Sequence, residues 1–341
     1  MNRISATSLK AKEAAQMLSR MQLHFVNILE TINTNAGYNG TFKSIEWVRN
    51  GGKFGGGARY ISPENGFFNR GAVNFSQIQY ESEKNKALRS ATALSIIIHP
   101  RNPKAPSFHM HVSFTEMKAG ESYWRIMADL NPAIVNDNDK LLFISSLKQA
   151  TGNYFTEGCE QGDQYFFIPL LKRHRGVSHF YLEKFTDETI AEPFINIMQN
   201  CYSEILSNYT KKMESTLEED AIQLAYHTLY FYQVLTLDRG TTSGLLVHNQ
   251  NDIGILASLP SHINRELLLI WRDKMVFPQR ELVDKLVNVL PEENICIITD
   301  KIKTQLAKQV REHYKKYPKA LTLQSAGNSI PTTVRNHQRT T

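Results

Sequence analysis

Two histidines, His109 and His111, stand two residues apart in a run from Ser107 to Phe114 that alternates polar and apolar side chains. Such alternation predicts a β-strand, in which side chains two positions apart lie on the same face of the sheet. Imidazoles exchange protons near neutral pH and bind transition metals. The polar face of this strand is therefore expected to form one wall of a functional site.

Charged side chains repeat the same spacing in two later runs. Arg125 and Asp129 share one face of the predicted strand Tyr123–Leu130, and Arg175 and His179 share one face of a later run that ends at Phe185. Asp129 stands at a strand end, where a carboxylate beside a cleft can accept a proton. If these strands are neighbours, a carboxylate, guanidinium groups and imidazoles meet on one sheet surface.

The elements that would position these side chains follow from periodicity. A helix over residues 7–32 is indicated by apolar residues recurring at spacings of three and four. Strands are predicted at 72–79, 93–99, 107–114, 123–130, 177–185 and 234–238, and further helices at about 137–151, 188–219, 260–274, 278–289 and 300–317. Consecutive strands followed by helices predict an α+β protein with a large antiparallel sheet covered on both faces by helices.

The glycine-rich stretch at residues 51–57 resembles a phosphate-binding loop only superficially. No Gly-Lys-Ser/Thr follows it and no long helix opens there, so hairpin turns and bulges are the favoured interpretation.

Composition bounds the class of protein. The chain has 341 residues, 41% hydrophobic and 21% charged, with no linker, which favours a single domain over 1–320 and a flexible basic tail over 321–341. The net charge of +6 comes from Lys and Arg scattered among acids, so a small-molecule substrate with carboxylates is favoured over nucleic acid. Three cysteines form no CxxC pair and no apolar run reaches a membrane span, so a cytoplasmic protein without membrane insertion is expected.

The segment from His99 to Phe114, HPRNPKAPSFHMHVSF, resembles the signature of the oxygen-dependent coproporphyrinogen III oxidases. Other pieces resemble the family in the same order, from about Met17 to Pro260: Gly71–Ser76, Asp129-Leu130-x-Pro132, Asp163-Gln-Tyr165-Phe166, Arg175-Gly176-Val177 and Asp238-Arg239-Gly240-Thr241. The chain is identified on these motifs as a member of that family.

The resemblance implies a flat antiparallel sheet between helices, commonly in a homodimer. It implies oxidative decarboxylation of propionate side chains to vinyl groups, with O2 as co-substrate, no organic cofactor and no generally accepted metal. Asp129 would anchor pyrrole N–H groups and assist proton loss, with His109 as the second catalytic residue and Ser76 at the same site.

Several positions depart from the family pattern. His111 and Ser113 replace an asparagine and a carboxylate-binding arginine, and Arg125-Ile126-Met127 replaces three glycines that would let a flat macrocycle approach the backbone. Ser178 and His179 replace two further glycines. We therefore expect an O2-dependent oxidase of a carboxylate-bearing, pyrrolic substrate with altered specificity. The residues expected to bind substrate are Asn74, Ser76, His111, Ser113, Arg125, Arg175, His179, Asp238 and Arg239.

Three other readings stay open at this point. The chain is a genuine coproporphyrinogen III oxidase, or a porphyrin- or haem-binding relative without catalysis. The third reading is a non-haem iron or copper oxidase whose metal is held by His109, His111, Asp129 and His179. The alternative to metal binding is that the same histidines are polar contacts to substrate or hydrogen-bonded residues of the sheet. For Asp238–Thr241 the alternative to substrate contact is that the segment holds a turn together.

Overall fold

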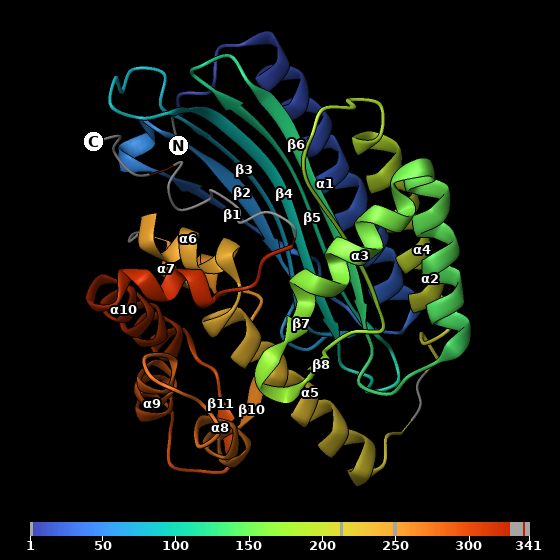
Figure 1. Ribbon diagram of the computed structural model, residues 1–341. Helices are drawn as coiled ribbons and strands as arrows, with labels where there is room; N and C mark the ends of the chain where they lie inside the picture. Colours follow the sequence, from blue (N-terminus) through green and yellow to red (C-terminus); the bar gives the residue numbers. More distant parts are fainter. Residues whose placement is uncertain (1–2, 212–213, 248–250, 328–336, 338–341) are drawn as a thin grey trace.

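A seven-stranded antiparallel sheet organises the molecule (Figure 1). The computed structural model describes residues 3–211, 214–247, 251–327 and 337. The strands follow the order β1-β2-β3-β4-β5-β6-β9, and every neighbouring pair is antiparallel. Their bounds are β1 Lys43–Val48, β2 Gly55–Ile61, β3 Phe68–Gln79, β4 Leu88–Pro100, β5 Ser107–Met117, β6 Ser122–Asn131 and β9 Ser178–Phe185. The α+β prediction is confirmed.

One face of the sheet is apolar and carries three helices: α1 Leu9–Asn35, α2 Asp137–Thr151 and α4 Ala191–Ser207 (Figure 1). Helix α1 begins at Ser8, whose hydroxyl accepts a hydrogen bond from the backbone N–H of Ala11. Its apolar stripe packs on strands β3 to β5 because alternate side chains such as Phe108 point toward it. Tyr202 of α4 stacks on Phe108 with ring centroids 4.6 Å apart.

The opposite face is polar in its centre and is covered by later elements (Figure 1). Helix α3 (Phe155–Phe166) runs along the edge strand β9, and α5 Leu217–Thr236, α6 Arg239–Val247 and α7 Asp252–Ile255 lie over the sheet. A second apolar core joins α5 to the remaining elements: β10 His262–Asn264, α8 Arg265–Arg272, α9 Gln279–Val289, β11 Ile295–Ile297 and α10 Asp300–Lys316. The short strands β7 Phe167–Ile168 and β8 Arg173–His174 pair with each other.

Three predicted elements differ from the structure. The helix predicted at about 260–274 begins only at Arg265, because residues 262–264 form strand β10. Residues 234–238, predicted as a strand, are the last turn of α5 and the two residues after it. Tyr226–Thr236 is buried on every side, so its apolar run shows no helical period and reads like a buried strand. The helix predicted over 188–219 is instead α4 followed by a loop and the start of α5, and α3 was not predicted.

The glycine-rich stretch is only partly a turn. Gly51 has φ 63° inside a single 3-10 turn, as the turn interpretation predicts, but Gly55–Gly57 opens strand β2. A Cβ built on Gly57 would lie 2.0 Å from the backbone oxygen of Phe75, so glycine is required by close strand packing.

The described part of the predicted tail, residues 321–327, begins with residues that pack against the rest of the protein. A 3-10 helix spans Pro318–Leu323, and Gln324 is buried. Its amide donates hydrogen bonds to Thr242 Oγ1 at 2.6 Å and to Tyr314 Oη at 2.9 Å. These contacts hold the segment against the rest of the protein, although its polar composition predicts a flexible tail. Residues 328–336 and 338–341 lie outside the described residues.

None of the helices in the described part of the chain has the length and apolar character needed to cross a membrane.

Candidate active site

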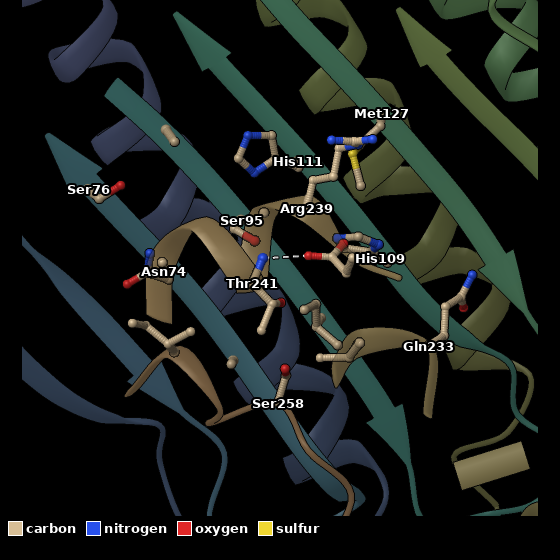
Figure 2. Close-up of a pocket in the computed structure, with 18 of the residues that line it drawn as sticks. Asn74, Ser76, Ser95, His109, His111, Met127, Gln233, Arg239, Thr241 and Ser258 are labelled. Carbon is tan, nitrogen blue, oxygen red and sulfur yellow. Dashed lines mark hydrogen bonds between the residues drawn. The ribbon is translucent and has the colours of Figure 1, made fainter. Parts of the chain in front are cut away.

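A cavity of about 260 Å³ lies between the polar face of the sheet and helices α3, α5, α6 and α7 (Figure 2). Asn74 and Ser76 of β3, and His109 and His111 of β5, line its sheet side, as the alternation predicts. Strands β5 and β6 pair side by side, which confirms the sheet arrangement on which the predicted site depends. Of the other predicted residues, Arg125, Arg175, Asp238 and Arg239 also line this cavity.

Asp129 is the centre of a buried charge network behind His109. Its side chain is wholly buried, its Oδ1 lies 3.0 Å from His109 Nδ1, and its Oδ2 accepts a hydrogen bond from Arg175 Nη2 at 2.9 Å. The side-chain amide of Asn131 also donates to this carboxylate. Burial by itself would raise the pKa of Asp129, but His109 and then Arg175 outweigh it and hold the pKa at about 2.

This network differs from the expectation that Asp129 contacts the substrate directly. Asp129 is not among the residues that line the cavity, whereas His109 is. The carboxylate fixes the orientation of the imidazole, and the imidazole is the group of this pair that a substrate in the cavity would meet.

Arg175 is held on two sides. Besides Asp129, its Nε donates to Asn131 Oδ1 at 3.2 Å, and its guanidinium lies 4.7 Å from the ring centroid of Tyr230. Since only 4% of its side chain is exposed, the ion pair with Asp129 accounts for its charge.

The guanidinium of Arg125 is also engaged in an ion pair. Its guanidinium forms a two-pronged ion pair with Glu183, with distances of 2.5 Å and 2.8 Å, and the Tyr181 hydroxyl donates to the same carboxylate. Arg125 borders the cavity with its charge already neutralised, so its expected role as a free anion anchor is not supported by this geometry.

Arg59 was missed by the sequence analysis, although it lines the cavity from strand β2. It is 4% exposed, and its Nη2 donates a 3.3 Å hydrogen bond to Asn251 Oδ1. Within the described residues no carboxylate pairs with it, and burial lowers its pKa to about 10, which leaves it charged at neutral pH. An arginine two residues after the packed glycines Gly55–Gly57, in the same run, was the available signal.

Arg239 provides a second such guanidinium (Figure 2). Its Nε and Nη2 donate to the backbone oxygens of Ser325 and Gln324, at 2.5 Å and 3.2 Å. Across the described ranges it has no carboxylate partner, and burial lowers its pKa. The neighbouring Asp238 accepts a 2.5 Å hydrogen bond from the backbone N–H of Thr241, so this residue holds the start of α6.

His111 enters the cavity as a neutral group. Burial first, and then the charge of Arg125 and the neighbouring His109, lowers its pKa to about 3.

The predicted metal-binding set is not brought together. His179 lies opposite Asp129 in the sheet register, but its Nδ1 is 2.8 Å from Asp163 Oδ1 and its ring stacks on Phe166. Neither His179 nor Ser113 lines the cavity, so their predicted contact with substrate has no support from this geometry. Ser113 is buried on the same sheet face beyond His111.

The fold and the site together define an α+β protein of an enzyme class. Its cavity lies over an antiparallel sheet and is lined by arginines and by a histidine that contacts a buried carboxylate. Residues 13–284 match the family model described as coproporphyrinogen III oxidase. The chain belongs to the coproporphyrinogen III oxidase family, an enzyme family of oxidoreductases that use O2.

Named relatives agree with this assignment at low identity. The oxygen-dependent coproporphyrinogen-III oxidase of Drosophila melanogaster is 27% identical over 74% of this chain and 71% of its own length. The enzyme of that name from Rickettsia akari is 27% identical over 65% of this chain and 84% of its own. The mitochondrial enzyme of Homo sapiens is 26% identical over 64% of this chain, which spans about half of the human protein, 54%.

Proposed function

We propose that this protein oxidises a carboxylate-bearing, pyrrolic substrate with O2 in the cavity over β3 to β6. The observation that carries the proposal is the pair of guanidiniums, on Arg59 and Arg239, that face the cavity without a carboxylate partner among the described residues. A buried cation without a counter-charge is costly, and a bound carboxylate would compensate it through charged hydrogen bonds.

The proposed reaction is oxidative decarboxylation of a propionate side chain. The C–C bond to the carboxylate breaks to release CO2, the adjacent C–H bond breaks, and a vinyl group forms. Two electrons and a proton pass to O2, which with a second proton becomes H2O2. His109, held by Asp129, would bind and transfer protons at the pyrrole or at the reacting side chain.

Altered substrate specificity is part of the proposal. The cavity volume of about 260 Å³ lies below the roughly 300–1,000 Å³ of typical ligand pockets. Met127 and the Arg125–Glu183 pair occupy the sheet surface where the family resemblance implies glycines. These side chains favour a substrate smaller than a tetrapyrrole with four propionates. The alternative, a genuine coproporphyrinogen III oxidase, is favoured by the family match itself.

The test is O2 consumption and CO2 release with a panel of mono-, di- and tetrapyrrole propionates, including coproporphyrinogen III, with formation of fluorescent porphyrin as a second readout. We expect turnover of a smaller pyrrole propionate and little or none of coproporphyrinogen III. Efficient turnover of coproporphyrinogen III would establish the alternative, and no O2 consumption with any member would reject the oxidase proposal.

We further propose a cytoplasmic homodimer. The free cysteines Cys159, Cys201 and Cys296 suit a reducing compartment, and the dimer is carried over from the family resemblance. Light scattering of the purified protein measures the mass directly, and a monomer at micromolar concentration would contradict the dimer.

A further inference from the structure

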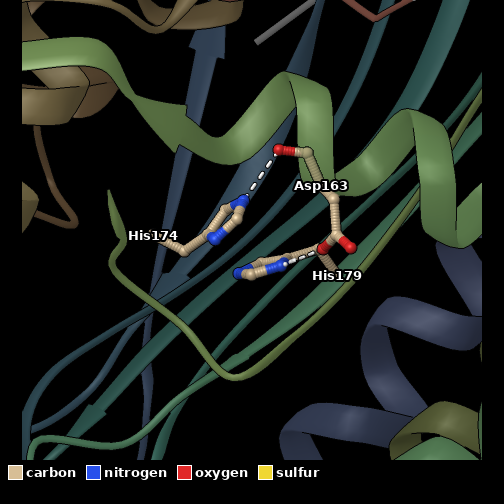
Figure 3. Close-up of side chains that lie close together, drawn as sticks. All are labelled: Asp163, His174 and His179. Atoms are coloured by element: carbon tan, nitrogen blue, oxygen red, sulfur yellow. Dashed lines mark hydrogen bonds and ion pairs between the residues drawn. The ribbon is translucent and has the colours of Figure 1, made fainter. Parts of the chain in front are cut away.

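A cluster of three side chains lies outside the cavity, at the sheet edge formed by β9 (Figure 3). Asp163 of α3, His174 of β8 and His179 of β9 each offer one ligand atom, and these atoms lie within 4.8 Å of one another. The imidazole rings of the two histidines face each other with centroids 4.6 Å apart and planes tilted by 32°. None of the three lines the cavity described above.

Asp163 fixes one nitrogen of each ring. Nδ1 of His179 lies 2.8 Å from its carboxylate Oδ1, and Nε2 of His174 lies 2.8 Å from its backbone oxygen. Both oxygens can only accept, so these two nitrogens carry the protons in the neutral imidazoles. The remaining nitrogens, Nδ1 of His174 and Nε2 of His179, therefore carry free lone pairs. Figure 3 shows them on the same side of the two rings, turned away from Asp163.

Nε2 of His179 is the unusual atom in this arrangement. His179 is 4% exposed, and this nitrogen has no hydrogen-bond partner within the part of the chain that the structure describes. Phe166 covers the other side of the ring in a stacked contact. A Cβ built on Gly176 would lie 3.0 Å from this nitrogen and 2.4 Å from Asn131 Oδ1, so glycine is required where the backbone passes close to the ring. A buried acceptor without a partner among the described residues indicates a ligand that the protein itself does not supply.

We propose that His174 Nδ1 and His179 Nε2 bind a divalent transition-metal ion of the zinc class. Imidazole nitrogen is a preferred ligand for Zn²⁺, Ni²⁺ and Cu²⁺. Asp163 acts as the orienting carboxylate that holds the ring of a metal-binding histidine by its second nitrogen. Water completes the coordination, since the side chain of Asp163 is 62% exposed and the cluster opens to solvent. The site would tie β8 and α3 to the edge strand β9.

This inference does not depend on the proposed oxidase function, and its test measures metal directly. The full-length chain is stripped with a chelator, dialysed, and titrated with Zn²⁺ alone by calorimetry, while thermal unfolding is followed in parallel. We expect one equivalent of Zn²⁺ per chain and a rise in Tm with Zn²⁺ concentration, because an ion that binds only the folded state stabilises it.

Variants separate a built site from surface binding. Asp163→Asn should weaken Zn²⁺ affinity by about 10–100-fold, as loss of an orienting carboxylate usually does, and His174→Ala should weaken it at least as much. His174 is only half-buried, so this variant is expected to fold, and a circular dichroism spectrum checks that it does. His24→Ala, an exposed histidine of α1, is the matched control and should bind Zn²⁺ like the wild type.

Two outcomes overturn the proposal. One is the absence of saturable Zn²⁺ binding by the wild type at a hundred-micromolar concentration. The other is binding that His174→Ala and Asp163→Asn leave unchanged, which would place the ion elsewhere.

Discussion

Asp129 and His109 face each other across strands β6 and β5, with 3.0 Å between the carboxylate Oδ1 and the imidazole Nδ1. The Asp129 carboxylate is buried, whereas the His109 imidazole lines the cavity. The negative charge therefore lies behind the histidine that would contact the substrate.

Replacing Asp129 by Asn should destabilise the protein by about 3–5 kcal/mol at pH 7, because Arg175 is left buried without its counter-charge. The pKa of Asp129 is about 2 in the folded state, below its ordinary 3.8, so its stabilisation is complete above pH 5 and is lost as the pH falls from about 4 toward 2. Urea unfolding of wild type and variant should therefore show a constant difference from pH 7 to 5 that narrows below pH 4. Asp220→Asn, at an exposed position of α5, is the control and should change the free energy of unfolding by less than about 0.5 kcal/mol.

Arg59→Met should change activity and stability in opposite directions. Since no carboxylate among the described residues pairs with Arg59, its buried guanidinium is costly, and its removal should leave the free energy of unfolding unchanged or raise it. The loss of a charged hydrogen bond to a substrate carboxylate should cost about 1.5–3 kcal/mol in kcat/KM, or roughly 10–150-fold. Steady-state kinetics and thermal unfolding measure both effects. Arg89→Met is the exposed control, and a destabilised Arg59→Met protein with unchanged kcat/KM would show that Arg59 is structural.

The pair Arg125–Glu183 should behave as a structural unit. Glu183→Leu alone removes the carboxylate of this ion pair from Arg125, and we expect a loss of about 3–5 kcal/mol in the free energy of unfolding. The double variant Arg125→Met/Glu183→Leu should recover most of that loss, which a double-mutant cycle measures. Because the charge is already neutralised, the KM of the double variant should stay close to that of the wild type. A KM raised more than about tenfold would return Arg125 to the substrate-binding set.

His111 should make folding sensitive to mild acid. Its pKa is about 3 in the folded state and near 6.5 when unfolded, so its contribution is complete above pH 6.5 and is lost as the pH falls toward 3. His111→Asn removes this dependence, and the slope of the free energy of unfolding between pH 6 and 5 should decrease by up to about 1.4 kcal/mol per pH unit. Urea unfolding at pH 7, 6 and 5 tests this, with the exposed His24→Asn as control. Equal slopes in wild type and His111→Asn would contradict a neutral His111 in the folded protein.

How far the sequence predicts the site depends on the interaction involved. Alternation along β5 and β6 places His109 and His111 correctly on the cavity face, because strand geometry determines which side chains share a face. It does not reveal that Asp129 is already paired with Arg175, since that contact joins residues 46 positions apart. For the same reason the partner of His179, Asp163 on α3, could not be predicted from strand pairing.

Helix α5 shows the corresponding limit for the fold. Only its first three residues, 217–219, fall within a predicted helix, and its second half is buried among the sheet, α8 and α9, where periodicity disappears. Arg59 illustrates the limit for the site: the sequence shows an arginine near the packed glycines, but it does not show that no carboxylate among the described residues pairs with it.

Ser325 and Gln324, whose backbone oxygens hold Arg239, come about forty residues after the last position matched by the family model, residue 284. One wall of the pocket is thus assembled from a stretch that the shared family pattern does not cover. Substitutions in that stretch alone can change substrate specificity while every signature motif is conserved. Two proteins with identical motifs would then differ in what they accept.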